Sequence, residues 1–96
     1  MINILINTTY GGYSLSEEAA EATSHIADRY ELTRKSYRTN PEVLRIFEEM
    51  GSEAFSGYCS EIEEVSIPDE ATDWMITEYD GLEEVIYVVD GKIHTA

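Results

Sequence analysis

Residues 85–93, Val-Ile-Tyr-Val-Val-Asp-Gly-Lys-Ile, carry the strongest structural signal of this chain. The first five are apolar or aromatic without polar alternation, which is typical of a strand with neighbours on both sides. Asp90-Gly91 then favours a two-residue type I′ hairpin turn. The stretch therefore predicts a central strand over Val85–Val89 and a tight reversal into a further strand.

The residues before this stretch also predict strands. Trp74 and Ile76 share one face of an extended chain over Asp73–Tyr79, and Met75 and Tyr79 share the other. This period of two indicates a strand.

A second turn and a shorter strand complete this half of the chain. Asp80-Gly81 marks a turn that we expect to be looser than the one at residues 90–91. Ile62, Val65 and Ile67 predict a short strand that Pro68 ends.

The N-terminal residues predict one more strand, over Ile2–Asn7. Ile2, Ile4 and Ile6 share one face by alternation, while Leu5 adds an apolar contact on the other. A strand this close to the start of the chain is expected to be tied into a sheet rather than frayed.

Two helices are expected between the first strand and the others. The first begins near Ser14 or Ser16, because Ser14 and Glu17 have capping-box spacing and Ser16 is followed by two acids. Its core-facing stripe contains Leu15, Ala19, Ala22, Ile26 and Tyr30.

The second helix has clear boundaries. Asn40 is the expected N-cap, Pro41 the first helical residue and Gly51 the left-handed stop. Its apolar face contains Val43, Leu44, Phe47 and Met50. One strand, two helices and a run of strands predict a single α+β domain over residues 1–96. We expect a mixed or antiparallel sheet of four to five strands, with helices on one face and acids on its exposed surface.

Composition narrows the classes of function. The 96 residues hold six Lys or Arg and twenty Asp or Glu, a net charge of −14. This charge argues against direct binding of nucleic acid or anionic lipid through a basic face. A single cysteine excludes an internal disulfide framework, and the absence of a long apolar run predicts a soluble, cytoplasmic protein.

The acids are unevenly distributed. Residues 1–50 hold five basic and eight acidic residues, for a net charge of −3, whereas residues 51–96 hold one and twelve, for −11. Alternate strand residues lie about 6.6 Å apart on one face, so such acids can imitate a phosphate backbone. The candidate partner-binding residues are Glu61, Glu63, Glu64, Glu78 and Asp80. The alternative is a highly soluble face that has no partner.

A glycine-rich loop gives a second candidate site. It lies between a strand and a helix N-terminus, where free N–H groups and the helix dipole favour an anion. The candidate ligand-binding residues are Tyr10, Gly11, Gly12, Ser14 and Ser16, with Arg34, Lys35 and Arg38 as possible helpers. The simpler interpretation is a tight turn before a self-capped helix, whose Glu17 and Glu18 would repel a phosphate.

Catalytic and metal chemistry have weak support in the sequence. His25 and His94 have no carboxylate and nucleophile at a suitable spacing, and Cys59 is expected to be a small buried residue. The acids lack the spacing of an EF-hand loop. We therefore expect no enzyme activity, no metal and no cofactor.

Several sequence blocks resemble a family of small tailed-bacteriophage proteins. The blocks are Asn7-x-x-Tyr10-Gly11-Gly12-x-Ser14-Leu15-Ser16, Arg38-x-Asn40-Pro41, Ile67-Pro68-Asp69, Trp74, Glu78-Tyr79-Asp80-Gly81 and residues 86–93. The resemblance implies a phage origin and a location in the infected host cell. A phage origin favours a small protein that binds and inhibits or redirects a host protein. Together with the acidic strand-rich half, it leads us to expect a nucleic-acid-binding host protein that is bound through mimicry. The alternative is a small-ligand or nucleotide-binding protein that uses the glycine loop.

Overall fold

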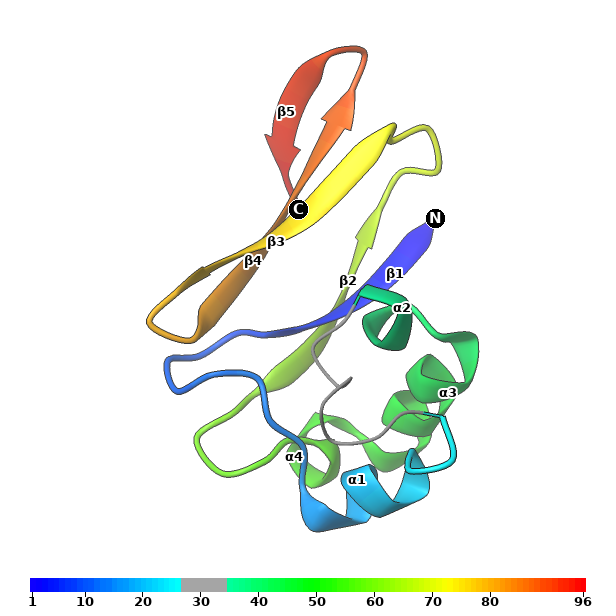
Figure 1. Cartoon of the computed structure of the whole chain (residues 1–96), viewed down its shortest axis with the longest axis vertical. Helices are drawn as coiled ribbons and strands as arrows, with labels where there is room; N and C mark the ends of the chain where they lie inside the picture. Colours follow the sequence, from blue (N-terminus) through cyan, green and yellow to red (C-terminus); the bar gives the residue numbers. More distant parts are fainter. Residues whose placement is uncertain (27–34) are drawn as a thin grey trace.

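The computed structural model describes residues 1–26 and 35–96, and it has the α+β class that the sequence predicts (Figure 1). Its elements, in chain order, are β1 (Ile2–Asn7), α1 (Glu17–Ala22), α2 (Lys35–Arg38), α3 (Pro41–Met50), α4 (Ser52–Phe55), β2 (Ile62–Ile67), β3 (Asp73–Tyr79), β4 (Leu82–Val89) and β5 (Lys92–Thr95). No helix in these two ranges is long and apolar enough to cross a membrane.

The strands form two antiparallel sheets, which corrects the expectation of one sheet of four to five strands. β1 pairs with β2, and β3, β4 and β5 form a second sheet in that order. Pro68 ends β2, and a turn closed by the Ala71 N–H to the Pro68 carbonyl redirects the chain before β3. The central position expected for Val85–Val89 is confirmed, because β4 pairs with β3 on one side and β5 on the other.

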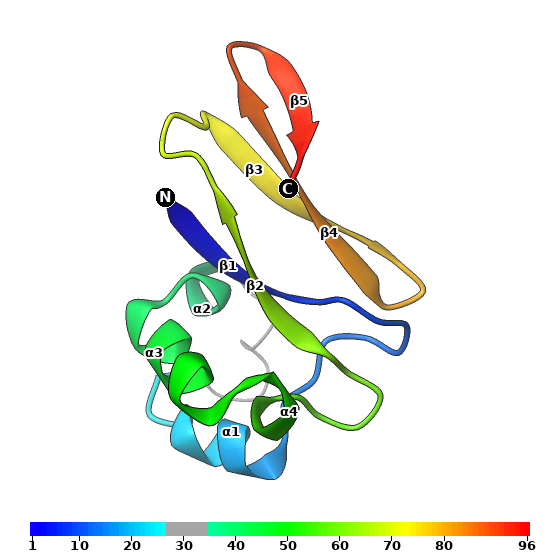
Figure 2. The same ribbon diagram turned by 180° about the vertical axis from the view of Figure 1, so that it is seen from behind.

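The molecule has three layers, with the β1–β2 ribbon in the middle (Figures 1 and 2). The helices cover one face of the ribbon and the three-stranded sheet covers the other. Each interface has its own apolar core. The helix side contains Leu5, Ala19, Tyr37, Val43, Ile46, Phe47, Phe55 and Ile62, and the sheet side contains Ile4, Ile6, Ile67 and Val85. The alternation read from residues 2–6 is thus confirmed, with Leu5 facing the helices and its isoleucine neighbours facing the second sheet.

The two expected helices form, with two short additions. Asn40 caps α3 by accepting from the Glu42 and Val43 N–H groups, and Gly51 ends it at φ 83°. For α1 the cap is Ser16, whose Oγ accepts from the Ala19 N–H, rather than the box begun by Ser14. One detail of the first predicted stripe differs, because Ala22 is exposed, and the predicted Tyr30 lies outside the described residues. The short helices α2 and α4 were not predicted.

Both hairpin turns are tight two-residue turns. Asp90 and Gly91 have φ values of 52° and 75°, as expected for type I′. Asp80 and Gly81 have φ values of 54° and 90°, so this turn is as tight as the first, and the expectation of a looser turn is wrong.

The outer face of the second sheet, which is turned away from β1–β2, is mainly apolar. The strand register places on it Asp73, Met75, Thr77, Tyr79, Leu82, Glu84, Ile86, Val88, Ile93 and Thr95. Only Asp73 and Glu84 are acidic, so the expectation that acids would cover this exposed surface is wrong. Along β4 the opposite residues face the core, which puts Glu83 inside.

A buried ion pair connects the helix layer to the second sheet. Arg38 of α2 donates from Nη1 to Glu83 Oε1 of β4 over 2.7 Å, with side chains 4% and 7% exposed. The same Glu83 oxygen accepts from the Asn7 N–H at the end of β1, at 2.8 Å. The Arg38 guanidinium also lies 3.9 Å from the centre of the Tyr13 ring. Burial raises the pKa of the Tyr13 hydroxyl, and Tyr37 and Glu83 raise this pKa further. The positive charge of Arg38 acts in the opposite direction but does not cancel the increase.

Glu83→Gln should lower the free energy of unfolding by about 3 kcal/mol, measured by urea denaturation. The amide oxygen can still accept from the Asn7 N–H, but the buried Arg38 charge loses its counter-charge, and breaking a buried pair is costly. Glu84→Gln is the matched control, since Glu84 is the next residue of β4 and is exposed. We expect this control to stay within about 0.5 kcal/mol of the parent. Equal stability of the two variants would contradict a stabilising role for the pair.

Candidate functional site

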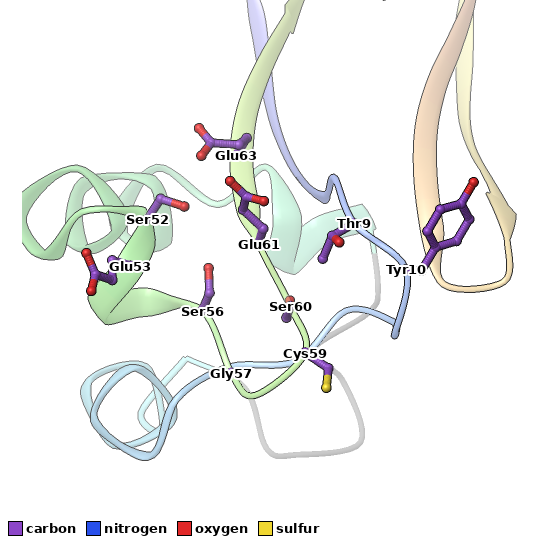
Figure 3. A pocket seen from close by; sticks show the side chains of 10 residues that line it. All are labelled: Thr9, Tyr10, Ser52, Glu53, Ser56, Gly57, Cys59, Ser60, Glu61 and Glu63. Carbon is purple, nitrogen blue, oxygen red and sulfur yellow. The ribbon is translucent and has the colours of Figure 1, made fainter.

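An open hollow of about 550 Å³ lies beside the start of β2, between α4 and the loop that follows β1 (Figure 3). It is lined by Thr9, Tyr10, Ser52, Glu53, Ser56, Gly57, Cys59, Ser60, Glu61 and Glu63. We call this the acidic hollow. It brings together members of both predicted sites, namely Glu61 and Glu63 of the acidic set and Tyr10 of the glycine loop.

Serine hydroxyls hold one wall of the acidic hollow in place. Ser52 Oγ donates to the Ile62 carbonyl at 2.5 Å, and Ser56 Oγ accepts from the Ile62 N–H at 2.8 Å. These bonds fix α4 against the first residue of β2. In Figure 3 the side chain of Glu63 lies on the Ser52 side of β2, whereas Tyr10 lies toward the β3–β4 hairpin.

The buried side chain of Asn7 holds the other wall. Its Oδ1 accepts from the Glu61 N–H at 2.9 Å and from Ser60 Oγ at 3.3 Å. Its Nδ2 donates to the carbonyls of Thr9 at 2.6 Å and Gly81 at 2.7 Å. One amide therefore joins the loop after β1, the start of β2 and the β3–β4 turn.

The electrostatics of the acidic hollow favour a cation. Glu53, Glu61 and Glu63 contribute three carboxylates, and none of the described residues that line the hollow is Lys, Arg or His. Such a surface attracts an ammonium or guanidinium group and repels a phosphate. Within residues 1–26 and 35–96, no group of three or more His, Cys, Asp or Glu is arranged to hold a metal ion.

The five acids proposed as a partner surface do not share one face. Glu61 and Glu63 line the acidic hollow, whereas Glu64 lies on the helix side of β2 near Glu48 of α3. Glu78 accepts the Gly81 N–H at 2.6 Å and so stabilises the β3–β4 turn. Asp80 is exposed in that turn, and its carbonyl accepts from the Gly11 N–H at 3.3 Å.

The contact with Glu48 changes the acidity of Glu64. Partial burial, the charge of Glu48 and a hydrogen bond to Glu48 together raise the pKa of the Glu64 carboxyl. Two carboxylates at this position therefore repel each other at neutral pH, which makes the pair unfavourable for folding.

The serines of the glycine loop bind the protein's own backbone. Ser16 Oγ accepts from the Ala19 N–H at 3.1 Å and donates to the Ala54 carbonyl at 2.6 Å. The Ser14 N–H donates to Ser60 Oγ at 3.4 Å, and Ser14 Oγ lies 3.5 Å from the Tyr58 carbonyl. Gly11 and Gly12 have φ values of 126° and 96°. The geometry is that of a turn packed against residues 54–60, with Tyr10 left exposed.

Of the basic helpers expected near this loop, Lys35 is engaged elsewhere, whereas Arg38 pairs with Glu83 while its guanidinium lies over the Tyr13 ring of the loop. Lys35 Nζ donates to the Trp74 carbonyl and lies 4.3 Å from the centre of the Trp74 ring. Arg38 is buried against Glu83. Arg34 lies outside the described residues.

Seven lining residues of the acidic hollow were not proposed as site residues, namely Thr9, Ser52, Glu53, Ser56, Gly57, Cys59 and Ser60. Cys59 is exposed with φ 63°, which corrects the expectation of a small buried residue. The sequence gives little signal for this set, because α4 is only four residues long and its acid has no periodic partner. Tertiary contacts with β2 bring these side chains together.

Comparisons with known proteins give no relative for this chain. No protein-family model matches it, and searches of curated proteins and of solved structures return no match.

Gly11→Ala should destabilise the protein more than Gly12→Ala, although both glycines have positive φ. A Cβ at Gly11 would lie 2.3 Å from the Cys59 carbonyl oxygen, whereas a Cβ at Gly12 would meet no atom within 4 Å. We expect a loss of about 1 kcal/mol for Gly12→Ala from backbone strain alone, and about 2 kcal/mol or more for Gly11→Ala. Thermal or urea unfolding measures both. Equal losses would show that the packing against Cys59 carries no cost.

Glu64→Gln should stabilise the protein at pH 7 by a few tenths of a kcal/mol, because Glu64 is only partly buried and solvent screens its repulsion by Glu48. The pKa of Glu64 is higher in the folded protein than in the unfolded chain, so between these two pKa values the folded protein binds more protons. The contribution of Glu64 to the free energy of unfolding therefore falls as the pH rises. The gain should therefore shrink toward pH 4, where the parent carboxyl is increasingly protonated. Glu70→Gln, which removes the same charge from an exposed site, is the control for net charge. A gain for Glu64→Gln that equals the control at both pH values would contradict the specific repulsion by Glu48.

Proposed function

We propose that this protein is a non-enzymatic binding protein that recognises a basic surface on another protein. The observation that carries the proposal is the acidic hollow, which Glu53, Glu61 and Glu63 line and to which the described residues contribute no cationic side chain. A net charge of −14 adds a long-range attraction that would speed association with a basic partner.

Mimicry of nucleic acid fits this arrangement. Glu61 and Glu63 are alternate residues on one side of the chain at β2, so their spacing of about 6.6 Å is set by strand geometry. Regular negative charges on a rigid support resemble a phosphate backbone, to which proteins bind through Lys and Arg. The resemblance to phage proteins makes a nucleic-acid-binding host protein, inhibited or redirected by this chain, the favoured partner.

The alternative function, binding of an anionic ligand at the glycine loop, has less structural support than binding of a basic partner. The Ser14 and Ser16 hydroxyls and the α1 N-terminus make bonds within the protein, and three glutamates line the adjoining hollow. Cys59 lies in the hollow, but the lining contains no histidine to act as its base.

The test compares captures from bacterial lysate by the tagged parent and by the triple variant Glu53→Gln, Glu61→Gln, Glu63→Gln. The variant keeps side-chain size and removes three charges from the hollow. Any protein captured by the parent is purified, and its binding is measured with increasing salt and with competing DNA. We expect the triple variant to lose about tenfold or more in affinity, and the parent to compete with DNA and weaken as salt rises.

The matched control is Glu17→Gln, Glu18→Gln, Glu21→Gln, which removes the same charge from exposed positions of α1. This control should retain most of the affinity. A partner that binds parent and triple variant equally, or that binds DNA and the parent at the same time, would contradict the proposal.

A further inference from the structure

The outer face of the β3–β4–β5 sheet is an apolar surface that the apolar cores do not use. Met75, Ile86, Val88 and Ile93 form its centre, and none of them belongs to either core cluster. Met75 is 52% exposed and Ile93 71% exposed. A small depression of about 120 Å³ lies among these four side chains and is lined also by Asp73, Trp74 and Tyr87.

No described element packs on this face. In both views the helices lie beyond the β1–β2 ribbon, on the far side of the molecule from the outer face (Figures 1 and 2). A sheet usually buries both faces or presents a polar one to water, so an apolar face of this kind marks an interaction site.

The dimensions of the outer face match one α-helix. Where β5 pairs with residues 86–89 of β4, three strands about 4.8 Å apart span about 10 Å between the outermost backbones, close to the 10–12 Å diameter of a helix with its side chains. β4 has eight residues, or about 26 Å of strand, which corresponds to about 18 residues of helix. The depression has about the volume of four liquid waters, enough for one aliphatic side chain at the helix centre.

The charges on the outer face select a basic partner and disfavour a second copy. Asp73 lies on the edge strand β3 and Glu84 lies two residues from Ile86 along β4, and the three strands place no Lys or Arg on this face. Two copies packed through it would bring these acids, and two chains of −14, within about one Debye length of each other. Lys or Arg beside the apolar stripe of a helix would instead pair with both acids.

We infer that the outer face binds an amphipathic α-helix of another protein, with an apolar stripe that is flanked by Lys and Arg. Helix on sheet is a standard layer packing, and an apolar helix face laid on a complementary surface is a common recognition mode. The inference is independent of the acidic hollow, because it uses a different face and a different set of residues.

The test uses a fluorescent helical peptide of about 18 residues with a Leu stripe flanked by Lys. Fluorescence anisotropy gives its Kd for the full chain, and amide chemical shifts map its position. We expect the largest shifts over residues 73–95. Met75→Ser combined with Ile93→Ser should weaken binding about tenfold, whereas Tyr58→Ser, at a residue 96% exposed elsewhere, should leave it within about twofold.

Three results would overturn the inference. The first is equal binding by a peptide with Leu replaced by Ser, which would mean that charge alone attracts it. The second is a shift map centred on Glu61 and Glu63, which would place the peptide in the acidic hollow. The third is a parent that sediments as a dimer and becomes a monomer with Ile93→Ser, which would make a second copy the occupant. Because the shift map uses the parent protein, the test does not depend on the folding of any variant.

Discussion

The carboxylate of Glu83 connects all three layers of this protein. One of its oxygens accepts from Arg38 on the helix side and from the Asn7 N–H at the end of the middle ribbon, while its own strand belongs to the second sheet. Burying these two charges is costly, and the geometry compensates because each has hydrogen-bonded partners. The two apolar cores on either side of β1 stabilise the packing through the hydrophobic effect, which is not directional. The Arg38–Glu83 ion pair is directional, and it therefore fixes how the helix layer and the second sheet are placed relative to each other.

The sequence predicted the parts of the fold that local chemistry determines. Alternation identified β1 and β3, and a continuous apolar run identified β4. Asn40 and Gly51 bounded α3, and Asp90-Gly91 identified a tight hairpin. The division into two sheets was not predicted, because it depends on how the chain turns after Pro68 and on which faces meet. Glu83 illustrates the limit. Alternation puts it on the same face as Val85, but next to Glu84 it resembles a solvated acid, and its partner Arg38 is 45 positions away.

The candidate site was predicted only in part for the same reason. Glu61 and Glu63 follow from strand spacing, but Glu53 joins them through the docking of a short helix that propensity does not predict. Glu64, one residue further along the strand, faces α3 and meets the charge of Glu48. A single step in register thus separates an acid that a partner can reach from an acid that opposes folding, and composition cannot distinguish the two.

Asn7 explains why the acidic hollow and the second sheet keep a fixed relation. Its Oδ1 holds the Glu61 N–H at the hollow, and its Nδ2 holds the Gly81 carbonyl at the β3–β4 turn. Aspartate has the same shape, but it would place a second acceptor against the carbonyls of Thr9 and Gly81 and add a charge close to Glu83. Only an amide offers donors and acceptors on the required sides. The acids of the hollow and the apolar outer face are therefore presented by one rigid framework, in which a neutral buried amide positions charges that it does not carry.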